Sequence, residues 1–156
     1  GLGLALKKPI ISIPTVDGLA YNLCGTDKIV CPLMDARRNQ VYTGIYEFEG
    51  SELKVLESQM AVDITEIAEK LNKLGREVVF LGDGWPVYAE KLSELLNVPF
   101  MAAPAHMSRQ RAGALAALAM VYAKDGRMET AVEHQPDYLR LSQAERERAE
   151  KEKASK

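Results

Sequence analysis

The chain has 156 residues, of which 47% are hydrophobic and 27% are charged, and its formal net charge is −2 at pH 7. A chain of this size can bury one core of its own, and without overall positive charge it is not expected to bind nucleic acid mainly by electrostatics unless its basic residues are segregated. No apolar run reaches the roughly 18 residues of a membrane span, so we expect no contact with a membrane. The two cysteines, Cys24 and Cys31, have no further cysteine or histidine cluster beside them, which excludes a local four-ligand zinc site and fits a reducing cytoplasm.

The amino-terminal part predicts a helix end, a strand and a second helix. Residues 1–8 are interpreted as the last turns of a helix, because two lysines lie at its carboxyl end and Pro9, which follows them, ends it. Because this start lacks an initiator Met, we expect further residues to precede it. Residues 9–13 are an apolar, β-branched run that predicts a short strand, and Thr15 is expected to cap a helix that extends to Leu23.

The next part predicts three antiparallel strands. Residues 29–34 form an apolar run, residues 41–48 alternate, and the polar turn at residues 35–39 joins the two as a hairpin. A Glu-Gly-Ser turn at residues 49–51 leads to a third strand that extends through Val62. These segments therefore predict a meander.

Helices and strands alternate beyond the meander. Asp63 is expected to cap a helix that ends at Gly75, and residues 78–81 predict a strand covered on both faces that leads through a glycine-containing turn into a helix. Residues 98–102 predict the last strand, and Ser108 is expected to cap the longest helix.

This order of elements predicts an α/β fold with one mixed five-stranded sheet. An antiparallel meander continues into parallel strands, and helices pack on the faces of the sheet. Such a sheet is typical of a ribonuclease-H-like or actin-like (ASKHA) lobe. We expect residues 1–140 to form this single lobe and the charged residues 141–156 to form a frayed tail.

Two features of the sequence are suited to nucleotide chemistry. Gly82 and Gly84 flank Asp83 between an apolar strand and a helix start, where backbone N–H groups and the helix dipole can hold a phosphate. Asp35 ends the first meander strand, where an actin-like phosphotransferase places a carboxylate that directs a metal ion. Against this role, non-glycine residues follow Asp35 and no lysine is placed to grip a phosphate. We therefore favour turn formation and interpret Gly82, Gly84 and Asp35 as a vestigial nucleotide site.

Four arginines form the other candidate contact site. Arg37 and Arg38 could meet an RNA phosphate or an acidic partner, or could be solvated, and Arg109 and Arg111 form a second short basic group. The two histidines belong to no metal-binding spacing, and no Gly-x-Ser-x-Gly pattern is present. We expect no catalytic residue, no metal site and no cofactor.

Four collinear segments resemble the TsaB family, also called YeaZ. They are the helix, strand and helix start at residues 3–20, the strand and turn VCPLMDARRNQVY at 30–42, the strand-to-helix turn GDGW at 82–85 and the closing segment AVEHQPDYLR at 131–140. The resemblance covers residues 1–140 in the right order.

The resemblance implies both an activity and partners. TsaB-like proteins are two-lobed, actin-like and non-catalytic, and help to install threonylcarbamoyl on the adenosine next to the anticodon of certain transfer RNAs. The resemblance implies a scaffold for the catalytic relative TsaD, with TsaE joining the assembly, TsaC supplying threonylcarbamoyl-adenylate, and transfer RNA involved indirectly. It also implies that the chain is the second lobe, and that the absent glycine-rich first lobe carries most of the surface for a homodimer and for TsaD.

Two alternatives stay open at this stage. The chain could be the enzyme lobe of an actin-like phosphotransferase or of a glycoprotease-type hydrolase, in which case Asp35 and the Gly-Asp-Gly turn would serve the reaction. It could also be an RNA-contacting module that uses the four arginines.

Overall fold

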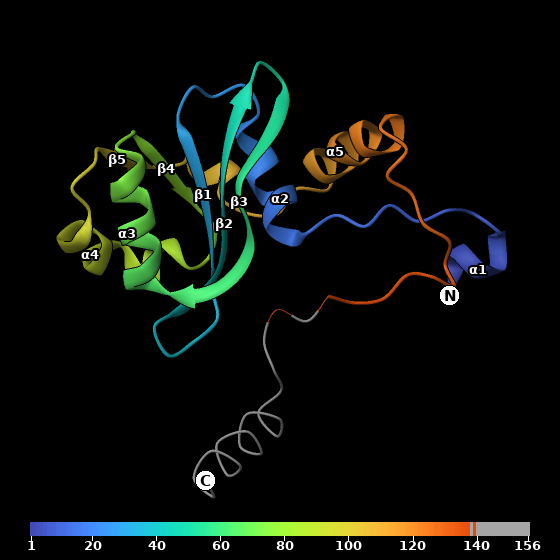
Figure 1. Ribbon diagram of the computed structural model, residues 1–156, viewed down its shortest axis with the longest axis horizontal. Coiled ribbons are helices and arrows are strands. Elements are labelled where there is room, and N and C mark those ends of the chain that lie inside the picture. Colours follow the sequence, from blue (N-terminus) through green and yellow to red (C-terminus); the bar gives the residue numbers. More distant parts are fainter. Residues whose placement is uncertain (138, 140–156) are drawn as a thin grey trace, which may run out of the picture.

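The sheet confirms the predicted fold class. The computed structural model describes residues 1–137 and 139. Its strands are β1 (Ile29–Asp35), β2 (Gln40–Glu49), β3 (Glu52–Asp63), β4 (Val78–Leu81) and β5 (Phe100–Ala102). They form one sheet in the order β3-β2-β1-β4-β5, in which β1, β2 and β3 are antiparallel neighbours and β1, β4 and β5 run parallel (Figure 1). This is the ribonuclease-H-like arrangement that the order of elements predicted.

Helices cover both faces of this sheet. The helices of the chain are α1 (Leu2–Leu6), α2 (Thr15–Ala20), α3 (Ile64–Leu74), α4 (Trp85–Leu95) and α5 (Ala112–Lys124), with short 3-10 turns at Tyr21–Leu23 and Ala105–Met107. Helix α1 has no buried residue and lies away from the sheet in Figure 1. In Figure 1, α3 and α4 lie on one side of the sheet and α2 lies on the other, with α5 beyond it. The sheet therefore lies between two helical layers.

The layer of α3 and α4 closes the first core. Its largest fully buried side chains are Ile29, Leu33, Ile45, Ile64, Ile67, Leu71, Phe80 and Leu92. As predicted, Asp63 caps α3, because its carboxylate accepts the backbone N–H of Thr65 at 2.9 Å, and Gly75 ends the helix with φ 66°. Phe80 stacks on Trp85 with 5.0 Å between the ring centroids, which fixes the start of α4 against β4.

The layer of α2 closes the second core. Val16, Leu19 and Ala20 pack against buried residues of β1, β2 and β4. Helix α5 lies on α2 so closely that a Cβ added at Gly18 would meet Leu115 Cδ1 at 2.8 Å. Only Leu118 and Tyr122 of α5 are buried, so most of this apolar helix faces outward.

The predicted strand at residues 9–13 is wrong. Ile10 alone pairs, with Glu129, in an isolated antiparallel bridge. Prolines at both ends of the segment remove the N–H donors that a longer ladder would need. The last strand is confirmed, although it begins at Phe100 rather than at Val98.

Two predicted helix caps are also wrong. Thr15 is the first residue of α2, and Pro14 holds the cap position without a side-chain hydrogen bond. Ser108 does not cap α5, which has Arg111 at its cap position. The backbone carbonyl of Ser108 instead accepts the N–H of Gly82 at 3.0 Å, so Ser108 belongs to the loop that supports the end of β4.

The predicted charged tail, residues 141–156, lies outside the described residues. Among the residues that are described, no helix is both long and apolar enough to cross a membrane.

Candidate functional site

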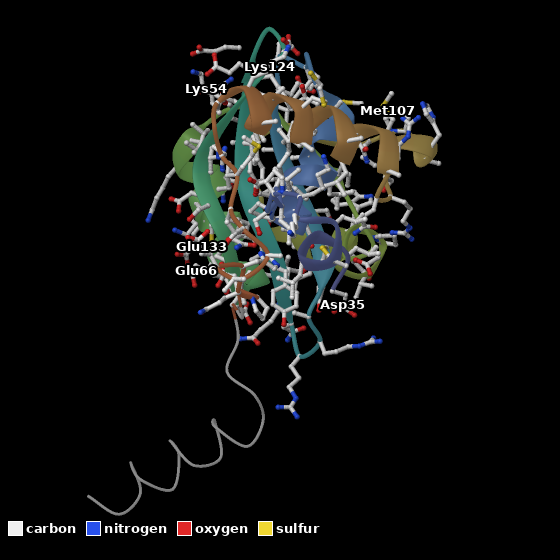
Figure 2. All side chains as sticks on the ribbon, turned by 90° about the vertical axis from the view of Figure 1, so that its right-hand side faces the viewer. Asp35, Lys54, Glu66, Met107, Lys124 and Glu133 are labelled. Atoms are coloured by element: carbon white, nitrogen blue, oxygen red, sulfur yellow. The ribbon has the colours of Figure 1, made fainter. Side chains whose placement is uncertain are left out.

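The candidate site lies where the parallel strands β1 and β4 end side by side. Asp35 is the last residue of β1, and Gly82 directly follows β4. The backbone N–H of Asp35 donates to Asp83 Oδ1 at 3.3 Å, so the two sequence motifs meet. Figure 2 shows Asp35 at the end of the molecule opposite to Lys54 and Lys124.

The two glycines of the turn hold the end of β4 against the end of β1. The N–H of Gly84 donates to the carbonyl of Leu33 at 2.9 Å, and the N–H of Gly82 donates to the carbonyl of Ser108 at 3.0 Å. A Cβ at Gly82 would lie 2.2 Å from the Leu33 oxygen, and the φ of Gly82 is 101°. The N–H groups of both glycines are thus already bonded to backbone carbonyls, so neither glycine has an N–H left for a phosphate. This arrangement favours a packing role for the glycines.

The carboxylate of Asp35 is bonded to the loop that follows it. It accepts the backbone N–H of Arg37 and the hydroxyl of Tyr88, each at 2.9 Å, and forms an ion pair with Arg37 at 3.1 Å. The backbone N–H of Arg37 and then the Tyr88 hydroxyl hold the pKa of the Asp35 carboxyl below its usual value. Asp35 is therefore ionised at neutral pH. Among the described residues, no group of three or more His, Cys, Asp or Glu is arranged to hold a metal ion.

The two predicted arginines stand at the tip of the β1–β2 hairpin. Arg37, Arg38 and Asn39 have φ angles of 65°, 54° and 60° and are all exposed. The second basic group lies nearby, because Gln110, which stands between Arg109 and Arg111, contacts Met34 Sδ at 3.8 Å. The end of β1 thus brings three predicted segments together: the hairpin, the Gly-Asp-Gly turn and residues 109–111.

Among the described residues, the histidines and cysteines make no hydrogen bond with Asp35 or with the Gly-Asp-Gly turn. His106 is exposed in a 3-10 turn, and His134 contacts Glu129 Oε1 at 2.8 Å near the isolated bridge. Burial raises the pKa of the Cys31 thiol to about 12, so Cys31 is a packed residue rather than a nucleophile. Cys24 is exposed and forms no disulfide.

A buried polar cluster on the α2 side was missed by the sequence reasoning. Asp17, only 5% exposed, accepts hydrogen bonds from Tyr46 at 2.6 Å and from Tyr122 at 3.1 Å. The Arg127 guanidinium lies over the Tyr122 ring, 3.4 Å from its centroid. Desolvation raises the pKa of Asp17, although the two hydroxyl donors partly oppose this. The cluster ties α2 to β2 and α5, and its place under the helices indicates a structural role.

Comparison with known proteins identifies the family. The family model of TsaD, tRNA N6-adenosine threonylcarbamoyltransferase, matches residues 1–148. A curated relative, the tRNA threonylcarbamoyladenosine biosynthesis protein TsaB of Bacillus subtilis (strain 168), is 30% identical over 154 residues, or 97% of this chain. The chain belongs to the TsaB (YeaZ) family. This confirms the resemblance seen in the four sequence segments.

Solved structures agree with this membership. A protein described as similar to peptidase YeaZ from Pseudomonas aeruginosa is 25% identical with a TM-score of 0.68, covering 90% of this chain and 63% of that one. YeaZ from Pseudomonas aeruginosa is 22% identical with a TM-score of 0.66, covering 88% and 64%, and supports the fold. The chain spans 65% of the length of the Bacillus relative.

Proposed function

We propose that this TsaB-family chain is a non-catalytic scaffold lobe in the biosynthesis of threonylcarbamoyladenosine on transfer RNA, supporting a TsaD-type transferase. The main support for the proposal is that the groups expected to bind a nucleotide are already hydrogen-bonded within the protein. The N–H groups of Gly82 and Gly84 are bonded to backbone carbonyls, and the Asp35 carboxylate is bonded to its own hairpin. An actin-like lobe that uses a nucleotide needs these groups to face the phosphates and the metal ion.

The competing candidate is a peptidase, favoured by the description of one structural relative. Ser12, His134 and Glu129 do lie together. However, Ser12 Oγ at 3.3 Å and Glu129 Oε1 at 2.8 Å both contact the same ring nitrogen, Nδ1 of His134. A serine hydrolase needs the nucleophile on one ring nitrogen and the orienting carboxylate on the other. This geometry therefore counts against hydrolysis.

The proposal includes the organisation of the whole protein. We place residues 1–140 in one lobe of a longer, two-lobed protein, because α1 exposes Leu2, Leu4 and Leu6 by 60 to 82%, more apolar surface than a short terminal helix normally leaves in water. Pairing with TsaD, with a TsaE-like protein and with a second copy is assigned mainly to the other lobe.

Transfer RNA is engaged through the assembly. We place this assembly in the cytoplasm, because two unpaired cysteines are stable in its reducing environment.

Titration calorimetry with the TsaD-type transferase of the same genome tests this proposal. The intact protein should bind, and residues 1–156 alone should bind weakly or not at all. Micromolar binding by residues 1–156 would place the dock within this lobe and contradict the assignment of the partner surface. Absence of binding by the intact protein would contradict the scaffold role itself.

A further inference from the structure

The tip of the β1–β2 hairpin has an unusual backbone for its sequence. Arg37, Arg38 and Asn39 occupy the left-handed region in succession, with φ angles of 65°, 54° and 60°. Asn tolerates this conformation, but a side chain with a Cβ such as arginine is disfavoured there, and glycine is the usual choice. Non-glycine residues held in this region often mark functional sites, because the side chain itself is needed.

Backbone hydrogen bonds within the hairpin and from helix α3 hold the tip in this conformation. Within the hairpin, the N–H of Ala36 donates to the carbonyl of Gln40 at 2.9 Å, and the N–H of Gln40 donates to the carbonyl of Arg37 at 3.0 Å. The N–H of Ile64, the first residue of α3, donates to the carbonyl of Asn39 at 2.9 Å. The tip is therefore ordered before any partner arrives, which reduces the entropy lost on binding.

Both guanidinium groups are accessible to an anion. The Arg37 side chain is 86% exposed, whereas its ion-pair partner Asp35 is 13% exposed. If Arg37 turned outward, Asp35 would keep the Tyr88 hydroxyl and the Arg37 backbone N–H as donors. Arg38 is exposed, and its side chain makes no hydrogen bond or ion pair with another described residue.

The surroundings of the tip favour a polyanion over a protein surface. No large apolar side chain between residues 35 and 43 is exposed, so the tip lacks the apolar anchor that protein interfaces usually bury. The segment of Arg109 and Arg111 lies beside Met34 and adds positive charge at the same end of the sheet.

We propose that the hairpin tip contacts the phosphodiester backbone of RNA, with Arg37 and Arg38 each meeting a phosphate. The choice of RNA rests on the proposed function, in which transfer RNA is the modified molecule. The contact is independent of base sequence, because phosphate contacts position an RNA without reading its bases.

The test is a titration of the full chain with an unmodified transfer RNA transcript. Binding is measured by fluorescence anisotropy at several salt concentrations. Arg37→Asn and Arg38→Asn remove each charge while keeping a residue that tolerates the left-handed conformation. Each should weaken binding about tenfold and reduce the slope of log K against log salt by about 0.7 to 0.9. Arg38→Lys should keep most of the slope.

Arg76→Asn is the matched control. Arg76 pairs with Glu47 and contacts the carbonyl of Asp27, just before β1 begins, so it lies at the opposite end of that strand. The Arg76→Asn variant should leave both the RNA affinity and the slope of log K against log salt unchanged. Thermal melts of all four variants exclude loss of folding as the cause of weaker binding.

Three results would overturn the proposal. They are no saturable RNA binding by the wild-type chain, equal weakening by Arg38→Asn and Arg76→Asn, and unchanged RNA binding by the tip variants. Tip variants that weaken binding to the TsaD-type transferase, while RNA affinity is unchanged, would assign the tip to a protein contact instead. A chain that supports nucleoside formation without touching RNA would contradict this contact and leave the scaffold proposal standing.

Discussion

The hydroxyl of Tyr46 on β2 lies 2.6 Å from Asp17 Oδ1 on α2, and both residues are buried. Tyr46→Phe would leave this buried carboxylate without its shortest hydrogen bond. We expect the variant to lose about 1 to 3 kcal/mol of unfolding free energy in urea titrations. Tyr42→Phe on the same strand is the control, because the Tyr42 hydroxyl makes no hydrogen bond to another described residue, and it should change stability little. Equal effects of the two substitutions would contradict a special role for the Asp17 pair.

Asp17 also predicts a specific pH dependence. Desolvation raises its folded-state pKa above 3.8, so in the range from pH 3.8 up to that folded pKa the folded state holds the proton more tightly than the unfolded state. Stability from this group is full below pH 3.8 and falls as the pH rises through that window. Asp17→Asn should remove this part of the pH dependence. An unchanged stability profile in the variant would show that Asp17 titrates normally.

Asp35 and Asp63 act in the opposite direction. Backbone N–H donors lower the pKa of each carboxyl, so their contribution is present above the unfolded pKa and is lost as the pH falls through the folded value. Their effect lies below pH 3.8 and does not overlap the window of Asp17.

Gly82 is predicted to contribute strongly to the stability of the fold. Gly82→Ala would place a Cβ 2.2 Å from the Leu33 carbonyl at a φ of 101°, and should reduce unfolding free energy by about 2 to 4 kcal/mol. Gly113→Ala in α5 meets nothing within 4 Å and should stabilise the chain by about 0.5 to 1 kcal/mol. Denaturant melts of both variants measure the contrast. A Gly82→Ala variant as stable as wild type would contradict the packing role of this turn.

The same geometry predicts that ATP does not bind appreciably. The two turn glycines have no N–H to offer, Asp83 would place a negative charge near the phosphates, and the turn has no lysine. We expect a dissociation constant above about 1 mM in calorimetry with magnesium and ATP, together with no hydrolysis. Saturable binding at micromolar ATP would favour the enzyme alternative. Because Gly82 variants are expected to be destabilised, the wild-type chain is the sample of choice.

Much of the fold was predictable because its signals are local. The meander follows from alternating runs and polar turns, and α3 follows from Asp63 and Gly75 at its two ends. The adjacency of Asp35 and Asp83 follows from the parallel pairing of β1 and β4, since the carboxyl ends of such strands meet at one edge.

The remaining features depend on contacts that a local pattern does not contain. Asp17 lies in the first turn of a helix, where an acidic residue is common, and its partners are 29 and 105 residues away in sequence. Arg37 and Arg38 adopt the left-handed conformation, but the sequence contains no glycine there that would have predicted it. Ser108 has the residue type of a helix cap, but its backbone carbonyl instead accepts the N–H of Gly82, 26 residues earlier in the sequence.

The most direct test of the scaffold claim is reconstituted formation of threonylcarbamoyladenosine, measured by mass spectrometry of nucleosides from transfer RNA. The reaction contains threonylcarbamoyl-adenylate, unmodified transfer RNA, and the TsaD-type transferase with the intact protein added or left out. We predict that the nucleoside forms only when the transferase is present, that the intact protein raises its yield, and that the intact protein alone gives none. Nucleoside formation by the intact protein without the transferase, or a yield that does not change when the protein is added, would contradict the account.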